Sequence, residues 1–238
     1  MTIRALQGFL NSLFSILKLK LTSPSYTQVC RRSKKLSFPS RIKSKKITDI
    51  VFDASGLKIY GEGEWKVRTH GYSKRRKWMK IHLGICPNTQ EILLSKLTDN
   101  SLKDIEVMTS LLDKANFPIG NVYGDALYDA EKCYEAIWRN NGRAIIPIRK
   151  NTRYTQPSKP WLKPRNDQIL EIKGIGGDNI AKSLWKKLKG YHKRSLVETA
   201  FYRWKQLLGG NLKSRCLENQ IIEAQLKCQM LNKMRLAS

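Results

Sequence analysis

The amino-acid sequence predicts an α/β protein with a mixed, five-stranded sheet and flanking helices. Apolar runs of strand length alternate with helical repeats, and turn residues lie at the joins. Along the chain we expect three strands, a helix, a strand, a helix, a strand, an irregular stretch and further helices. A hairpin followed by single strands and helices needs both antiparallel and parallel pairing, so the sheet should be mixed.

The net charge of the chain is extreme for its size. Its 45 Lys and Arg outnumber 19 Asp and Glu, which gives a formal charge of +26 over 238 residues. The usual partner of such a chain is nucleic acid, bound through its phosphates. An anionic membrane surface is the alternative, but the sequence has no apolar run of about 18 residues.

The cysteine pattern is typical of a cytosolic protein. The chain has five cysteines, an odd number, and no C-x-x-C pair. A disulfide scaffold and a zinc site are therefore both disfavoured. We expect reduced thiols in the core or on the surface.

Residues 1–47 are predicted to form a basic helical segment and linker. They contain 11 Lys and Arg and no acid. Apolar residues from Leu6 to Leu17 repeat at helical spacing, and a second helix begins near Ser23, which looks like its N-cap. The pair would suit a helix-turn-helix-like DNA reader with Arg31 and Arg32 on the DNA. The alternative is an ordinary helix pair that ends in basic residues.

The first predicted strand covers residues 47–56 and has Asp53 near its end. Asp53 follows Ile50, Val51 and Phe52, an apolar run typical of a central buried strand. A carboxylate there is costly to bury unless it is paired or bound to a metal. The alternative is an aspartate that forms a turn at the strand end.

Basic residues alternate with aromatic residues between residues 62 and 82. Trp65, Tyr72 and Trp78 are interleaved with bases, which suits phosphate contacts combined with stacking. The four consecutive bases of this stretch are Lys74, Arg75, Arg76 and Lys77. An ordinary basic loop is the alternative interpretation.

Further strands and helices follow in regular order. Strands at 79–86 and 91–97 flank a turn and form a hairpin, and a helix over 101–115 begins at Ser101 as its N-cap.

The next strand, 117–124, is directly followed by Asp125. Asp129 looks like the N-cap of a helix over 130–140, so we expect no chemistry from it. The fifth strand covers residues 143–148.

The region from residue 149 to 190 is predicted to be rich in loops. Prolines and glycines are frequent there, and a helical run begins only near Asp178. The last amphipathic helix is expected over 219–234. Its predicted apolar side consists of Ile221, Ile222, Leu226 and Met230.

A lone acid, Glu198, lies among bases in the stretch from residue 191 to 205. Read as a helix, this stretch places Tyr191, Arg194, Glu198 and Lys205 on one face, because their spacings are 3, 4 and 7. The opposite, apolar face consists of Leu196, Val197, Ala200, Phe201, Trp204 and Leu208. The alternative is a glutamate on a solvated face that pairs with an arginine four residues earlier.

Three carboxylates could meet if the first and fourth strands are neighbours. Asp53 and Asp125 would then lie at the same end of the sheet, and a helix across that end would supply Glu198. Such a group repels itself unless a divalent cation lies between its members, and hard oxygen ligands suit Mg²⁺ or Mn²⁺. A pair of such ions supports in-line displacement at phosphorus.

These motifs resemble the DDE transposases of bacterial insertion sequences, in the group marked by a Y-x2-R-x3-E-x6-K signature. Here the signature residues are Tyr191, Arg194, Glu198 and Lys205, with all intervals intact. The surroundings of Asp53 and Asp125 are similar to the family's first and second motifs, and residues 61–68 and 70–76 also look like the family. The resemblance covers essentially the whole chain.

The resemblance implies an RNase H-like catalytic domain over residues 48–238. It implies that Asp53, Asp125 and Glu198 are catalytic ligands of Mg²⁺ or Mn²⁺, as two ions. It also implies that Tyr191, Arg194 and Lys205 contact DNA. The expected partners are double-stranded DNA at transposon ends and targets, and a second copy of the chain when two ends are paired. The expected location is the bacterial cytoplasm, at the nucleoid, with no membrane contact.

Two alternatives to an active transposase stay open. In the family the stretch similar to residues 5–11 lies well inside the protein, whereas this chain begins almost at it. We therefore expect an N-terminally truncated or internally initiated transposase whose DNA-binding segment, 1–47, is partial. One alternative is a catalytically inactive, truncated DNA-binding protein that competes for transposon ends. A further reading is another RNase H-like nuclease, such as a resolvase.

Overall fold

The computed structural model describes residues 2–36, 47–59, 78–150, 152–155 and 159–236. The predicted DNA-binding bases Lys74, Arg75, Arg76 and Lys77 lie outside these residues, as do Trp65 and Tyr72.

The described chain forms one mixed sheet around the long strand β1. The strands are β1 (Thr48–Ile59), β2 (Trp78–Ile85), β3 (Ile92–Asp99), β4 (Ile119–Tyr123), β5 (Arg143–Ile145) and β6 (Asn211–Leu212). Their order is β3-β2-β1-β4-β5, and the short β6 pairs in parallel with β1. β2 and β3 form the predicted hairpin, whereas β4 and β5 run parallel to β1. This confirms the predicted RNase H-like α/β architecture, with β6 as an additional strand.

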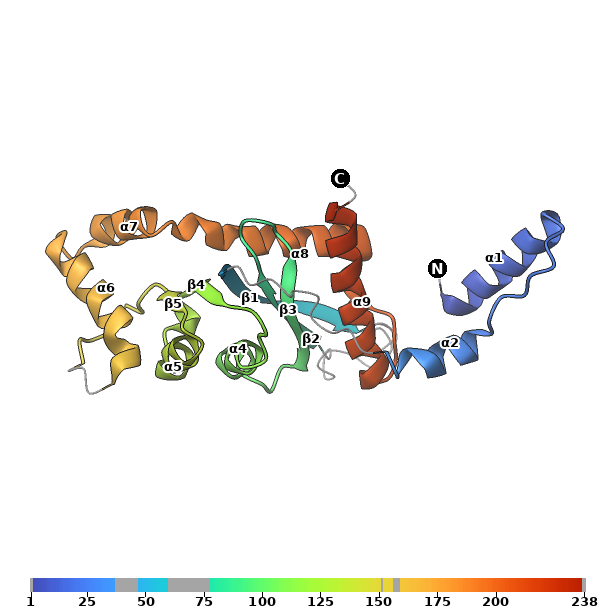
Figure 1. Cartoon of the computed structure of the whole chain (residues 1–238), viewed down its shortest axis with the longest axis horizontal. Coiled ribbons are helices and arrows are strands. Elements are labelled where there is room, and N and C mark those ends of the chain that lie inside the picture. Colours follow the sequence, from blue (N-terminus) through green and yellow to red (C-terminus); the bar gives the residue numbers. More distant parts are fainter. Residues whose placement is uncertain (1, 37–46, 60–77, 151, 156–158, 237–238) are drawn as a thin grey trace, which may run out of the picture.

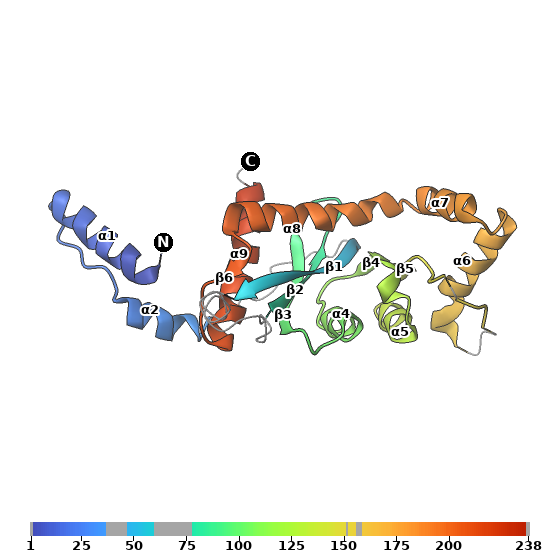
Figure 2. The same cartoon turned by 180° about the vertical axis from the view of Figure 1, so that it is seen from behind.

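Helices cover both faces of the sheet (Figure 1). They are α1 (Ile3–Ile16), α2 (Tyr26–Ser33), α4 (Asp104–Leu112), α5 (Glu131–Arg139), α6 (Lys163–Gly174), α7 (Asn179–Leu188), α8 (Ser195–Leu208) and α9 (Leu217–Leu236). The 3₁₀ turns η1 (Ala126–Tyr128), η2 (Pro160–Leu162) and η3 (Tyr191–Arg194) connect them. One hydrophobic core lies between the sheet and α4 and α5, and another lies beneath α7, α8 and α9. Figure 2 shows α8 running along the sheet on the side opposite α4 and α5.

The parallel pairing of β1 with β4 sets the position of two acids. The last pair in this register joins Val51 to Tyr123. Asp53 and Asp125 each come two residues later, at the carboxyl edge of the parallel pair. The condition on which the predicted carboxylate group depended, that the first and fourth strands are neighbours, is therefore met.

Helix α6 lies where the sequence predicted loops. Its prolines do not break it, because Pro160 and Pro164 stand in the first turns of η2 and α6, where no intrahelical N–H bond is lost. Gly176 and Gly177 follow the helix with positive φ angles and end it. The same residues that suggested irregular structure thus mark the two ends of a helix.

The helix boundaries and one helix face differ from the predictions. Helix α4 begins at Asp104, with Lys103 as N-cap, because Ser101 instead binds the Asp99 carboxylate. On α9, Leu226 and Met230 are exposed. The buried residues of α9 are Gln220, Ile222, Ala224, Lys227, Cys228, Leu231 and Asn232.

Helices α1 and α2 lie beyond α9, at the end of the molecule opposite α6 (Figure 1). Ser25 rather than Ser23 caps α2 and accepts a hydrogen bond from the backbone of Gln28. Neither helix contains a buried residue, although Lys34 pairs with Glu218 of α9 at 2.9 Å. In the described part of the chain, no helix is both long enough and apolar enough to cross a lipid bilayer.

Candidate active site

Asp53 lies within β1, at the point where the parallel neighbour β4 stops. β1 continues to Ile59, so the prediction that Asp53 stands near the strand end is wrong. Because β4 is shorter than β1, it ends before it reaches Asp53. The Asp53 side chain is therefore 19% exposed. One carboxylate oxygen, Oδ1, accepts the backbone N–H of Ala54 at 2.8 Å.

Asp125 lies two residues after the end of β4 and caps the turn η1. Its Oδ1 accepts a hydrogen bond from the backbone N–H of Leu127 at 2.9 Å. A Cβ atom on Gly124 would lie 2.8 Å from Cδ2 of Tyr128. Only glycine therefore allows the chain to turn this closely behind Asp125.

Arg194 joins Asp53 to Glu198. It is the last residue of η3, and its Nη2 donates to Oδ2 of Asp53 at 3.0 Å. Its Nη1 donates to Oε1 of Glu198, one turn further along in α8. The guanidinium thus connects the central strand to the first turn of α8, and the Glu198 side chain remains 55% exposed.

The charges of this site act on one another. Burial raises the pKa of Asp53, and the negative charges of Asp125 and Glu198 raise it further. The Ala54 N–H and the Arg194 guanidinium oppose this rise. Burial would lower the pKa of Arg194, but Asp53 and Glu198 together raise it. The carboxylates therefore form one electrostatic group with Arg194 as their counter-charge.

Lys205 and Tyr191 belong to the same side of the molecule. Nζ of Lys205 donates to Oγ of Ser55 on β1 at 2.8 Å. Tyr191 stands in η3 rather than in an α-helix, and burial together with the nearby acids raises the pKa of its phenol. On the opposite face of α8, Val197 and Trp204 are buried as predicted.

Family comparisons agree with this geometry. Two family models match the chain, and both are described as a transposase DDE domain. One covers residues 44–233 and the other covers residues 1–62. The chain belongs to the DDE transposase family. It is a transposase of the insertion-sequence type, and the longer match includes Asp53, Asp125 and Glu198.

The donor set of the transposase fits a hard divalent cation, which DDE domains generally use. Its donors are carboxylate oxygens from three separate elements, the ligand type that Mg²⁺ and Mn²⁺ prefer. Among the described residues no three acids, histidines or cysteines stand in a ready-made metal geometry. The guanidinium of Arg194 lies between Asp53 and Glu198 and pairs with one oxygen of each. A bound cation would displace this arginine from the two acids.

The predicted DNA-binding residues of the transposase fall into separate regions. Arg31 and Arg32 lie on α2, where they are exposed and line a cavity of about 480 Å³ together with Lys34 and Lys35. Helix α2 lies beyond α9, whereas the signature residues belong to η3 and α8 (Figure 1).

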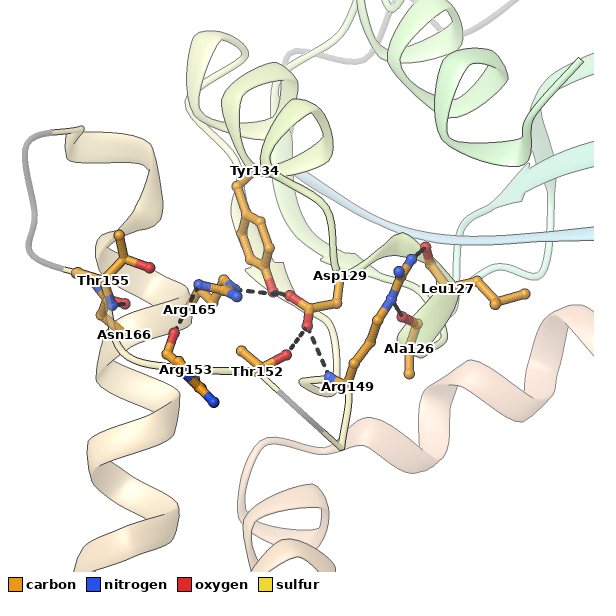
Figure 3. Close-up of polar contacts among 10 residues, drawn as sticks. All are labelled: Ala126, Leu127, Asp129, Tyr134, Arg149, Thr152, Arg153, Thr155, Arg165 and Asn166. Atoms are coloured by element: carbon orange, nitrogen blue, oxygen red, sulfur yellow. Dashed lines mark hydrogen bonds and ion pairs between the residues drawn. The ribbon is translucent and has the colours of Figure 1, made fainter.

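Asp129 has a role that the sequence did not reveal. Ala130, not Asp129, occupies the N-cap of α5. The Asp129 side chain is only 1% exposed and accepts hydrogen bonds from several segments (Figure 3). A capping aspartate and a buried aspartate both precede a helix, so the local sequence gives no signal that separates them.

Proposed function

We propose that this transposase cuts DNA strands at transposon ends and joins the released 3′-hydroxyl groups to target DNA. The observation that carries the proposal is that Asp53 and Asp125 lie at the same edge of two neighbouring parallel strands, and that Arg194 links Asp53 to Glu198. Asp53 comes from the middle of β1, Asp125 from the turn after β4, and Glu198 from the first turn of α8. Membership of the DDE family supports the same reaction class.

Asp53, Asp125 and Glu198 would hold Mg²⁺ or Mn²⁺, and we propose two ions. Bound ions of this kind lower the pKa of water and stabilise the attacking and leaving oxygens at phosphorus. The three carboxylates would hold the ions at the carboxyl edge of the parallel pair β1 and β4. A cation bound there would relieve the repulsion that the charges of Asp125 and Glu198 exert on Asp53.

Arg194, Lys205 and Tyr191 are proposed to hold the DNA next to the carboxylates. When a cation takes Asp53 and Glu198, the Arg194 guanidinium becomes available for a phosphate, for which its planar fork is suited. Lys205 adds an exposed ammonium on the same side. The charge of +26 supports double-stranded DNA as the partner, with Arg31 and Arg32 as further contacts. We also propose that two copies pair two transposon ends.

Substitution of single carboxylates tests this function. In Asp53→Asn, Asp125→Asn and Glu198→Gln, cleavage of a labelled transposon-end duplex should fall about 10³-fold or more with Mg²⁺ or Mn²⁺. Binding to the same duplex, measured by gel shift, should persist. The matched control is Asp113→Asn, which removes an exposed aspartate paired with Arg139. Normal cleavage by any of the three variants would show that the substituted residue is not catalytic.

One observation favours a second function. Arg194 pairs with two of the three acids, an arrangement that would also suit a DNA-binding protein that competes for transposon ends without cutting them. Such a protein would shift end duplexes in a gel and leave them uncut with either metal. A preference for branched over linear duplexes would instead indicate a resolvase-like nuclease.

A further inference from the structure

The buried carboxylate of Asp129 accepts four hydrogen bonds, and it lies four residues after Asp125 of the candidate active site. Its side chain lies between the turn η1 and helix α5 (Figure 3). Oδ1 accepts from the Tyr134 hydroxyl at 3.1 Å and from Arg165 Nε at 3.1 Å. Oδ2 accepts from the Arg149 backbone N–H at 2.8 Å and from Thr152 Oγ1 at 2.7 Å. Four donors satisfy the acceptor capacity of an ionised carboxylate, which offsets the cost of burying its charge.

The side chain of Arg149 connects this group to the turn that carries Asp125. Nε donates to the Ala126 carbonyl at 3.0 Å, and Nη2 donates to the Leu127 carbonyl at 2.7 Å (Figure 3). These are consecutive carbonyl groups immediately after Asp125. The Asp125 carboxylate binds the N–H of Leu127 in the same turn. The turn is therefore held by Arg149 at its carbonyls and by Asp125 at an amide.

We propose that Arg149 is a positioning residue for Asp125, and that Asp129 aligns Arg149 for this task. The inference rests on the proposed role of Asp125 as a metal ligand. Asp129 binds the backbone N–H of Arg149, which fixes where the arginine leaves the chain. The planar guanidinium then clamps two successive carbonyls, which a single ammonium could not do with the same geometry.

Helix α6 takes part in this assembly. Arg165 of α6 supplies one of the four bonds to Asp129, and its Nη1 also donates to the Arg153 carbonyl at 3.4 Å. Asn166, the next residue, donates to the Thr155 carbonyl at 2.7 Å. Helix α6, which the sequence did not predict, therefore holds residues 152–155 and the Asp129 carboxylate together.

The decisive experiment is a double-substitution cycle on metal binding without DNA. We would measure Mn²⁺ affinity of the full chain, by electron paramagnetic resonance, for wild type, Arg149→Met, Asp125→Asn and the double variant. Arg149→Met should weaken binding about 10–100-fold, as loss of a ligand's supporting partner does. It should cause no further loss when Asp125 is already changed. Unchanged affinity, or an equal loss in both backgrounds, would overturn the inference.

Two variants separate positioning from other roles of an exposed arginine. Arg139→Met removes an arginine that pairs with exposed Asp113, and it should bind Mn²⁺ like wild type. Arg149→Lys should lose affinity by less than Arg149→Met, because it keeps one donor. A direct DNA contact by Arg149 would instead leave Mn²⁺ affinity of the DNA-free protein unchanged in both variants.

Hydrogen exchange keeps this inference distinct from the proposed function. In Arg149→Met the backbone amides of residues 126–128 should exchange faster, while amides of the core strand β1 keep their protection. If wild type and Asp125→Asn bind Mn²⁺ alike, the proposed metal role of Asp125 fails. Faster exchange would then still support the clamp on the turn. Unaltered exchange at residues 126–128 would contradict the clamp whatever the metal result.

Discussion

At the scale of single residues, Arg194 governs the charge of the site. It pairs with both Asp53 and Glu198 while its own side chain is only 23% exposed. A positively charged group this close to two metal-ligand candidates opposes a cation that needs the same oxygens. Arg194 therefore has two expected effects: it weakens metal binding in the free protein and it favours DNA binding.

Removing the charge of Arg194 should separate these two effects. In Arg194→Gln the Mn²⁺ affinity of the DNA-free protein should rise about tenfold, which corresponds to about 1.4 kcal/mol. Cleavage of end DNA should fall, because the phosphate loses its guanidinium partner. The control is Arg203→Gln, an arginine of the same helix that lies beside Leu231 of α9. Weaker Mn²⁺ binding in Arg194→Gln would contradict the expected competition between Arg194 and the cation for the same carboxylate oxygens.

The signature spacing predicted that Arg194, Glu198 and Lys205 share one face, and Arg194 and Lys205 both contact β1 while Glu198 pairs with Arg194. It could not predict the ion pair of Arg194 with Asp53, since the partners are 141 residues apart. Nor could it separate Asp129 from an ordinary N-cap. Long-range bonds of this kind depend on strand register, which single-residue patterns do not contain.

At the scale of elements, α8 carries the site because its other face is anchored in the core. Trp204 is completely buried, and Val197, Ala200 and Phe201 line the same core. The periodic apolar stripe made this face predictable. The face of α9 was not predictable, because buried Gln220, Lys227 and Asn232 find polar partners there, as Asn232 does on the backbone of Ile92.

Truncating Trp204 should therefore loosen the helix that presents Glu198. We expect Trp204→Ala to lower the free energy of unfolding by about 3–5 kcal/mol, the usual cost of such a cavity. Tyr202→Ala, on the same helix with 64% of the residue exposed, should cost about 0.5 kcal/mol or less. Denaturant titrations of both variants give the comparison. Equal losses would mean that α8 is not anchored through Trp204.

At the scale of the whole molecule, the net charge predicts nucleic acid as the partner, and the alternation of strands and helices predicted the mixed sheet. The prediction of a loop-rich stretch was wrong for α6, because prolines at helix starts look like loop prolines in the sequence. The pairing of β1 with β4 was only a condition in the sequence analysis, and the strand order meets it. Whether the chain is N-terminally truncated stays a prediction.

Stability of the whole fold should fall in acid through His82. This buried histidine of β2 bonds to Thr98 at 2.9 Å, and burial lowers its pKa to about 4. Asp104 opposes that shift, whereas Lys80 and Lys96 add to it. The unfolded chain takes up the proton near its ordinary pKa of 6.5, so stability is lost as the pH falls from about 6.5 to about 4.

The expected loss from this histidine is about 2–3 kcal/mol. Urea denaturation at several pH values should show it in wild type. In His82→Gln this part of the pH dependence should be absent, while the contribution of the carboxylates remains. Parallel pH profiles of the two proteins would show that His82 is not the cause.

The central claim is that Asp53, Asp125 and Glu198 belong to one metal site, and Fe²⁺-directed cleavage of the protein itself tests it most directly. Fe²⁺ bound in place of Mg²⁺, with ascorbate and peroxide, cuts the backbone next to its ligands, and mass spectrometry identifies the fragments. We expect cuts near residues 53, 125 and 198, suppressed together by excess Mg²⁺ and by Asp125→Asn. Cuts confined to other parts of the chain, or cuts near only one of the three, would contradict it.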